Sequence, residues 1–166
     1  MATWLLARLA PLALAAAAPP ADEPVPIAGA GDWKLVEQLP GVSHPVCHAR
    51  INGPEADTML MLNNDRLPIL VAGRADWREL LGEADVSLSI DGGPPIGLKM
   101  QMFNNLVMKL VDDKALLGRL RRARTLDWAF PFGRFRANVS GIDVALDALA
   151  SCARRHARQS PAPQKS

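Results

Sequence analysis

The most constraining feature of the sequence is a pair of alternating segments that meet at a turn. In residues 86–91 and 96–102, apolar side chains alternate with small or polar ones. A period of two residues is typical of a β-strand with one buried face. Two glycines and two prolines at 92–95 supply the residues that a turn needs. This part of the chain therefore predicts an antiparallel hairpin, and with it a β-rich fold.

Further strands are predicted where short apolar or alternating runs end at glycine, proline, asparagine or aspartate. Pro68 lies in one of them and has no amide hydrogen to donate, so this strand is predicted to lie at an edge or to begin near that residue. The predicted strands cover residues 33–39, 45–51, 58–62, 67–71, 106–110, 126–130 and 135–139.

Two helices are predicted in the second half of the chain. Asp112 and Asp113 precede the first, at 114–124, and aspartate at a helix start can cap free amide groups. Residues 140–143 (Ser-Gly-Ile-Asp) match the serine-x-x-acid capping pattern at the start of the second. Apolar residues then recur at helical spacing as far as Cys152, which places that cysteine on the face toward the sheet.

The amino-terminal residues have the pattern of a secretory signal. Arg8 supplies positive charge, residues 9–18 are apolar apart from one proline, and alanines at 15 and 17 favour cleavage after Ala17. A membrane-spanning helix needs about 20 apolar residues, more than this run offers, and an uncleaved anchor is the alternative. We therefore predict a periplasmic or secreted bacterial protein with no membrane span after signal cleavage.

The composition along the chain predicts four parts. Residues 1–17 are the signal peptide, and residues 18–31 form a linker rich in proline and alanine, a composition that buries little surface. Residues 32–157 suit a single β-rich domain in size. Residues 158–166 are predicted to be a disordered tail.

The chain has two cysteines, Cys47 and Cys152. In an exported protein an even number of cysteines suggests a disulfide, and two allow only one intramolecular pairing. The bridge would join an early strand to the last helix. The alternative is a pair of free, buried thiols. Neither cysteine belongs to a Cys-x-x-Cys pair, so no catalytic or metal role is predicted for them.

The charges are nearly balanced, with 19 basic and 17 acidic residues in all. Residues 18–152 carry 14 basic and 17 acidic residues, a net charge of −3, because Arg8 precedes this range and four cations follow the last cysteine. The domain is therefore not predicted to bind nucleic acid. Aromatic residues make up 5% and tyrosine is absent, which is poor material for stacking on sugars or bases.

A basic cluster is the most prominent charged feature. With Arg134 and Arg136 nearby in sequence, it would suit an envelope protein or an anionic component of the cell envelope. The alternative is a solvated helix face that nearby aspartates balance. The cluster consists of Lys114, Arg119, Arg121, Arg122 and Arg124.

The sequence predicts no catalytic residue, metal site or cofactor. His44 and His48 flank Cys47. A zinc site needs at least a third ligand, and further residues that orient the ligands, and this pattern supplies neither. Asp91 precedes a glycine as in aspartic proteases, yet Asp-Gly is itself a turn signal. The two candidate serines, Ser43 and Ser140, lie outside any Gly-x-Ser-x-Gly motif.

Residues 138–146 (Asn-Val-Ser-Gly-Ile-Asp-Val-Ala-Leu) resemble the Ser-Leu-x-Gly-Phe-x-x-Ala ending of the invasion-associated locus B family. Here Ser140 adjoins Gly141 instead of preceding it by two residues, and Ile142 stands in place of the phenylalanine. The resemblance implies a small exported proteobacterial protein with a compact β-rich domain and a short helix. It supplies no catalytic residues.

Together these features predict one α+β domain, an antiparallel sandwich-like sheet with a short helix and a carboxyl-terminal helix packed on it. The function that fits best is an exported, non-catalytic binding protein of the cell envelope. An accessory role in an envelope or secretion machine is a second hypothesis. The remaining alternative is an envelope hydrolase whose site is assembled from scattered residues.

Overall fold

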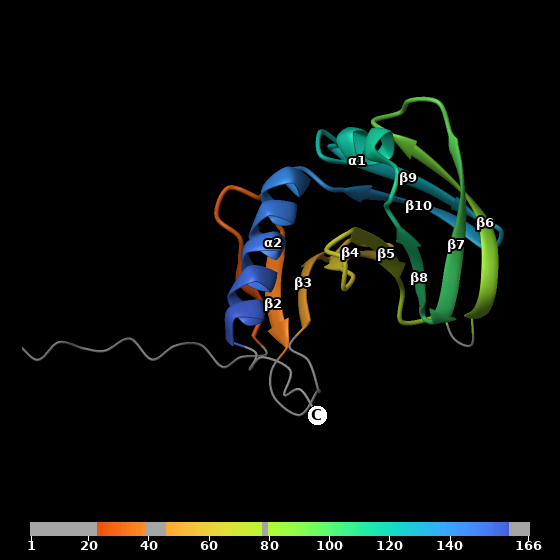
Figure 1. Cartoon of the computed structure of the whole chain (residues 1–166). Helices are drawn as coiled ribbons and strands as arrows, with labels where there is room; N and C mark the ends of the chain where they lie inside the picture. Colours follow the sequence, from red (N-terminus) through yellow and green to blue (C-terminus); the bar gives the residue numbers. More distant parts are fainter. Residues whose placement is uncertain (1–22, 39–45, 78–79, 160–166) are drawn as a thin grey trace, which may run out of the picture.

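The computed structural model describes residues 23–38, 46–77 and 80–159, which form ten strands and two helices. Figure 1 shows their arrangement. In chain order they are β1 (Val25–Pro26), β2 (Lys34–Gln38), β3 (Val46–Ile51), β4 (Asp57–Leu62), β5 (Pro68–Gly73), β6 (Leu80–Ile90), β7 (Ile96–Asn104), β8 (Leu106–Leu110), α1 (Lys114–Leu120), β9 (Thr125–Phe130), β10 (Gly133–Asn138) and α2 (Ile142–Gln159).

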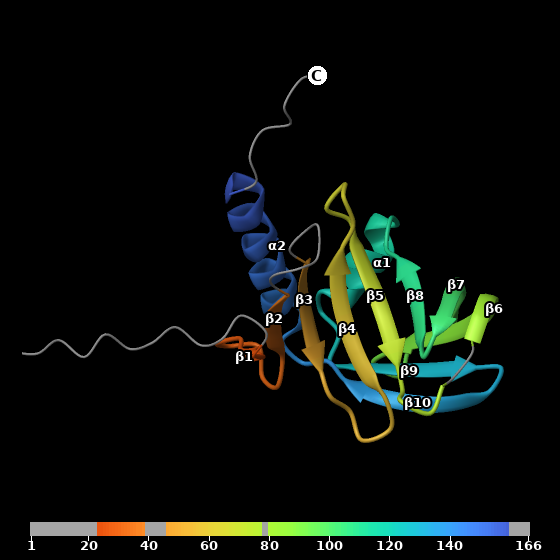
Figure 2. The same cartoon turned by 90° about the horizontal axis from the view of Figure 1, so that it is seen from below.

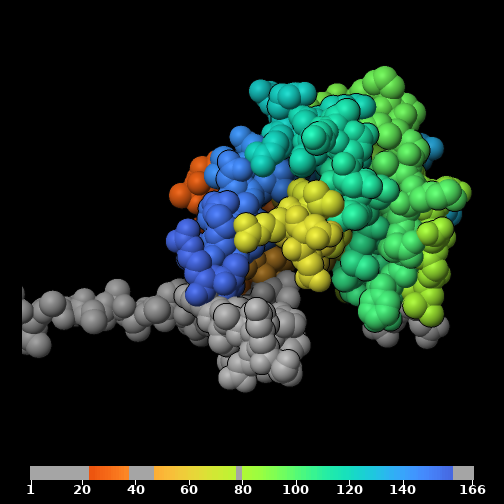
Figure 3. Space-filling model, in the orientation of Figure 1, coloured from red at the N-terminus to blue at the C-terminus, as the bar shows by residue number. Residues whose placement is uncertain are grey.

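All ten strands belong to one antiparallel sheet in the order β1-β2-β3-β4-β5-β8-β7-β6-β9-β10. The prediction of an α+β domain on an antiparallel sheet is confirmed. The sheet bends so strongly that β9 and β10 lie above β4 and β5 in Figure 1 and run at a steep angle to them in Figure 2. The turn between β4 and β5, yellow in Figure 3, lies between α2 and β8.

The predicted hairpin is the longest part of the sheet. Val86 pairs with Leu98, and the ladder continues to Leu80 opposite Asn104, beyond the predicted ends. Val86 and Leu98 turn their side chains into the core, while Glu83 on the other face is exposed. The strands extend further than predicted because their outward positions accept polar residues without breaking the alternation.

The core lies between the inner face of the bent sheet and the two helices. Its largest side chains are Trp33 and Trp128, both almost fully buried. The indole nitrogen of Trp33 donates to the carbonyl oxygen of Val139 at 3.4 Å, which ties the first strands to the approach of α2. Trp128 stacks on Phe130 and Phe135 with ring centroids 5.7 and 6.1 Å apart.

The predicted linker is wrong in its second half. Val25 pairs with Leu35 in the sheet. Ala30 is fully buried, and its backbone packs so closely on Gly141 that a Cβ on that glycine would lie only 2.6 Å away. Pro26 is tolerated because β1 is an edge strand, where one face of the backbone makes no ladder bonds. Residues 1–22, with the predicted signal peptide, lie outside the described residues. At the other end α2 continues to Gln159, two residues beyond the predicted domain end.

The helix starts agree only in part with the predictions. Asp113 caps α1 as predicted, with its carboxylate accepting from the amide of Ala115 at 2.7 Å. Ser140 does not cap α2, because its hydroxyl donates to the side chain of Asn138 at 2.8 Å. Gly141 turns the chain into α2 with a φ of 83°. Within the described part of the chain, neither helix is long and apolar enough to cross a membrane.

The sequence predicted that the first helix extends to Arg124. In the structure α1 ends at Leu120. The amide of Arg122 bonds to the carbonyl of Arg119 at 3.1 Å, which tightens the last turn and directs the chain into β9. Arg121, Arg122 and Arg124 therefore follow the helix instead of lying on one of its faces.

A disulfide joins the sheet to the last helix. Cys47 on β3 and Cys152 on α2 are bonded at 2.07 Å, with their Cα atoms 6.2 Å apart. Both cysteines are buried, and α2 packs against β2, β3 and β4 around them. The predicted pairing thus agrees with the structure, and it closes a loop that spans 105 residues of sequence.

We expect that changing both cysteines to serine will lower the free energy of unfolding by about 2–4 kcal/mol, because a long closed loop restricts the unfolded chain. Urea unfolding of the oxidised protein and of the double variant measures this difference. Adding reductant to the wild type should bring it close to the variant. Identical midpoints for oxidised and reduced wild type would show that the bridge does not form in solution.

Candidate functional site

A groove of about 620 Å³ lies on the outer face of β6, β9 and β10. This face is the one that points away from the core. Strand pairing places the groove's side chains in two rows across the three strands. The first row is Ser87, Ala129 and Arg134, and the second is Ser89, Asp127 and Arg136.

Small residues make the floor of this groove low. Ser87 pairs with Gly97 on β7, and a Cβ at Gly97 would meet no atom within 4 Å. On the other side Ser87 pairs with Ala129, which adds only a methyl group. The floor therefore offers two serine hydroxyls and exposed backbone between the taller side chains of Pro95 and Arg134.

The groove carries one more cation than anion. The guanidinium of Arg136 donates to the carboxylate of Asp127 at 2.5 Å, and this hydrogen bond raises the pKa of Arg136. The backbone amide of Arg136 donates to Glu55 at 3.4 Å. Arg134 is exposed and makes no hydrogen bond or ion pair with any residue that the structure describes. Its guanidinium is therefore available to a ligand in the groove.

The groove lies against a sheet edge. β10 is the last strand in the order, so one side of its backbone has no neighbouring strand. Unpaired backbone groups at such an edge can accept an extended peptide. The contact between Glu55 and the amide of Arg136 occupies one of these groups.

The predicted basic cluster is not assembled as one helix face. Arg121 is neutralised by Asp147 on α2, with 3.1 Å between nitrogen and oxygen. Arg119 is partly buried, and its guanidinium lies 3.8 Å from the point where a Cβ on Gly93 would be. Within this cluster, Lys114, Arg122 and Arg124 are exposed and make no ion pair with any described residue.

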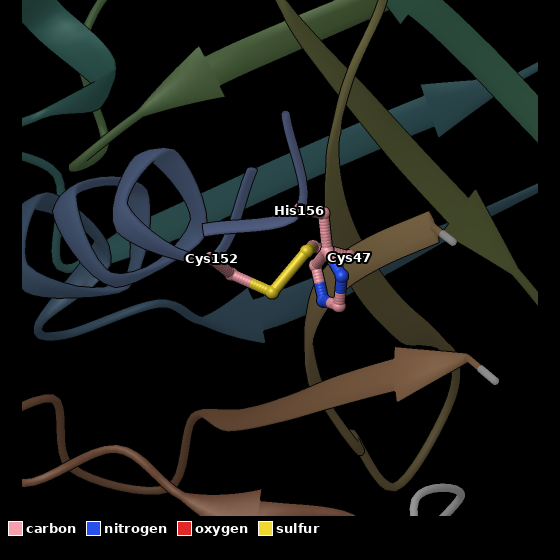
Figure 4. A group of neighbouring side chains, drawn as sticks. All are labelled: Cys47, Cys152 and His156. Atoms are coloured by element: carbon pink, nitrogen blue, oxygen red, sulfur yellow. A yellow bond between two sulfur atoms is a disulfide. The ribbon is translucent and has the colours of Figure 1, made fainter. Parts of the chain in front are cut away.

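The histidine beside the disulfide is His156, for which the sequence predicted no role. Figure 4 shows its ring close to Cys47 and Cys152. It lies one helical turn after Cys152, and this spacing is the signal that could have found it. Its Nε2 atom is 3.2 Å from the carboxylate of Glu37 on β2. Because the two sulfur atoms are bonded to each other, neither is a thiolate that could bind a metal in this state.

Of the two histidines that flank Cys47 in the sequence, only His48 lies among the described residues, and it is not part of this group. His48 alternates with Cys47 along β3 and so points to the outer face of the sheet. Burial lowers the pKa of His48, and the nearby charge of Arg50 lowers it further. His44 and Ser43 lie outside the described residues, and Ser140 takes part in the local turn before α2.

Asp91 has a structural role at the hairpin turn. Its carboxylate accepts from the backbone amides of Arg124 and Thr125, at 2.8 Å each. These amide bonds lower the pKa of Asp91. The residue adopts a φ of 52°, which aspartate tolerates better than most side chains. The turn predicted from the Asp-Gly pair is therefore also hydrogen-bonded to the start of β9.

No protein-family model and no curated protein matches the chain. One solved structure is similar, the crystal structure of invasion associated protein B from Bartonella henselae. The superposition has a TM-score of 0.54 at 18% sequence identity and covers 75% of this chain and 96% of that one. The likeness is one of fold. It confirms the resemblance that residues 138–146 suggested, and it carries no activity or partner over to this chain.

We expect Asp91→Ala to lower the free energy of unfolding at pH 7 by about 1 kcal/mol, because two backbone amides lose their acceptor. The effect is small because the carboxylate is exposed and water screens its charge. Since folding lowers the pKa of Asp91, its stabilising effect is present above the unfolded pKa of about 4 and is lost as the pH falls through the folded value.

Urea unfolding of wild type and variant at pH 7 and pH 2.5 measures both effects, with Asp85→Ala as a control on the same strand. The gap between wild type and Asp91→Ala should narrow at the lower pH. A gap of the same size at both values would contradict the assigned role of the charged carboxylate.

Proposed function

We propose that the protein is an exported, non-catalytic binding module of the cell envelope, and that the groove on β6, β9 and β10 binds a carboxylate-bearing partner. The observation that carries the proposal is Arg134, an exposed guanidinium without an ion partner among the described residues, above a floor of serine hydroxyls. The bent sheet then serves as a sandwich-like scaffold that holds the groove in shape.

The chemistry of the groove favours a carboxylate. A guanidinium presents its donors in a planar fork that matches the two oxygens of this group. Ser87 and Ser89 can add hydroxyl donors from the floor. Asp127 holds Arg136 in place and also puts a negative charge in the groove, which disfavours a densely charged polyanion. A partner with one or two acidic side chains suits this balance best.

Two features support export. The amino-terminal pattern of a short apolar run with small residues before the cleavage point is typical of a secretory signal. A disulfide that closes the main domain is stable in an oxidising compartment such as the periplasm or the cell exterior. We therefore place the proposed binding module in the periplasm or outside the cell.

The hydrolase alternative gains no support from the groove. Ser87 and Ser89 are the hydroxyl groups there, and neither His48 nor His156 lines it. A serine nucleophile needs a base within hydrogen-bond reach to accept its proton. The carboxylate of Asp127 is already occupied by its hydrogen bond to Arg136. The arrangement therefore fits binding better than catalysis.

The test uses a fluorescently labelled threonine-rich peptide that carries two glutamates, titrated with purified protein at low salt. We expect Arg134→Glu to weaken binding at least tenfold, because it replaces the available cation by an anion. Arg122→Glu makes the same charge change in the exposed turn after α1 and should leave binding within twofold. Thermal melting checks that both variants remain folded.

The same titration separates the two basic surfaces. If Arg122→Glu abolishes binding and Arg134→Glu does not, the partner binds at the basic cluster and the groove assignment is wrong. A lysine-threonine peptide serves as the charge-reversed control. Equal affinity for both peptides would show that the groove does not select a carboxylate.

A further inference from the structure

The disulfide and the residues around it form a group that the proposed function does not use. Glu37 on β2 and Cys47 on β3 are direct partners in the sheet, so their side chains leave it on the same face. Cys152 and His156 are four residues apart on α2, so they lie on one face of that helix. Because α2 packs against both strands, the two pairs meet between the sheet and the helix.

Three potential metal ligands come together at this place. The sulfur atoms of Cys47 and Cys152 and a ring nitrogen of His156 all lie within 4.8 Å of one another. Figure 4 shows the imidazole ring beside the disulfide. In a tetrahedral zinc site, Zn–S bonds of about 2.3 Å and Zn–N bonds of about 2.1 Å place the ligand atoms about 3.5–3.8 Å apart. The three residues are therefore close enough to share one ion once the sulfur atoms are no longer bonded to each other.

Glu37 is placed to support the histidine. Its carboxylate lies 3.2 Å from Nε2 of His156 and also accepts a hydrogen bond from the guanidinium of Arg155. A carboxylate bonded to a metal-binding histidine fixes the orientation of the ring and strengthens it as a ligand. Glu37 is therefore a positioning residue in this group, and the charge of Arg155 balances its own.

We propose that reduction of the disulfide converts this group into a zinc site with Cys47, Cys152 and His156 as its ligands. The reductant is a dithiol, which gives up two electrons and two protons and becomes a disulfide, while the chain gains two thiols. Zinc then binds both sulfur atoms as thiolates, and the two thiol protons pass to solvent. A disulfide oxidant reverses the change, because it takes two electrons from the thiolates, the bond between the cysteines forms again and Zn²⁺ leaves.

The ligand set favours zinc over other common cations. Thiolate and imidazole groups suit zinc, whereas Mg²⁺ and Ca²⁺ bind oxygen ligands. Cu²⁺ takes electrons from thiolates and would drive the pair back to the disulfide, but Zn²⁺ has no such redox step. Two thiolates also cancel the charge of Zn²⁺. The filled site therefore adds no net charge among side chains that are largely shielded from water, with both cysteines buried and the side chain of His156 only 12% exposed.

The zinc site would hold α2 on the sheet in the reduced state as the disulfide does in the oxidised state. Both links join β3 to α2 through the same two cysteines, which are 105 residues apart in the sequence. Zinc binding at this place therefore requires the folded chain. It does not depend on the carboxylate groove, which lies on the outer face of β6, β9 and β10.

The test is a titration with Co²⁺, which replaces Zn²⁺ and reports its ligands by its absorption spectrum. The protein is reduced with a phosphine, which is then removed under argon. Reduced wild type should bind one ion, with the intense d–d bands of a tetrahedral site and a thiolate charge-transfer band, and Zn²⁺ should displace it. Oxidised wild type should bind none. His156→Ala and Glu37→Gln should each weaken binding by about tenfold or more. His48→Ala removes a histidine next to Cys47 on the outer face and should stay within about twofold of wild type.

Near-ultraviolet circular dichroism, to which the buried Trp33 and Trp128 contribute, shows whether the reduced chain is folded. If reduction unfolds it, Zn²⁺ should restore the folded signal in wild type but not in Cys47→Ser, which retains only the two ligands on α2. A reduced chain that binds Co²⁺ without the thiolate band, or that Zn²⁺ neither fills nor refolds, overturns the proposal. Binding that survives in His156→Ala, or is lost in His48→Ala, overturns the assigned ligands. Glutathione disulfide should release the ion, and retention of Zn²⁺ after the bridge has formed would overturn the redox coupling.

Discussion

The structure depends on one constraint, the alternation of side chains along an unbroken antiparallel sheet. Because ten strands are hydrogen-bonded in a single order, every residue on them is assigned to the inner or the outer face. A register shift of one residue in β5 would place Val71 in the core and expose Leu70 and Ala72, which are now fully buried. The core and the groove are therefore consequences of the same pairing.

The bend of this sheet needs an element to close its open side, and α2 supplies it. The disulfide fixes one point of α2 to β3, and Glu37 on β2 holds the next turn through Arg155 and His156. These contacts lie on the same stretch of helix, so the covalent bond and the contacts to Glu37 support one geometry. Ala30, packed against Gly141, fixes the start of the helix in the same way.

Local patterns predicted what local forces decide. The turn at Asp91, the cap at Asp113 and the inward direction of Cys152 each follow from residues a few positions away. The sequence could not predict that β5 pairs with β8 or that β6 pairs with β9, because those ladders join segments far apart in the chain. The groove exists only after that pairing, whereas the basic residues near α1 are neighbours in the sequence itself.

The outer face has two chemistries, and β6 is the strand that carries both. Its first half presents Leu81 and Glu83 beside β7, while its second half presents Ser87 and Ser89 beside β9. The change occurs because β6 is long enough to pair with β7 along most of its length and with β9 only at its end. A partly apolar surface and a polar groove can therefore lie on one face without overlapping, since the length of a single strand separates them.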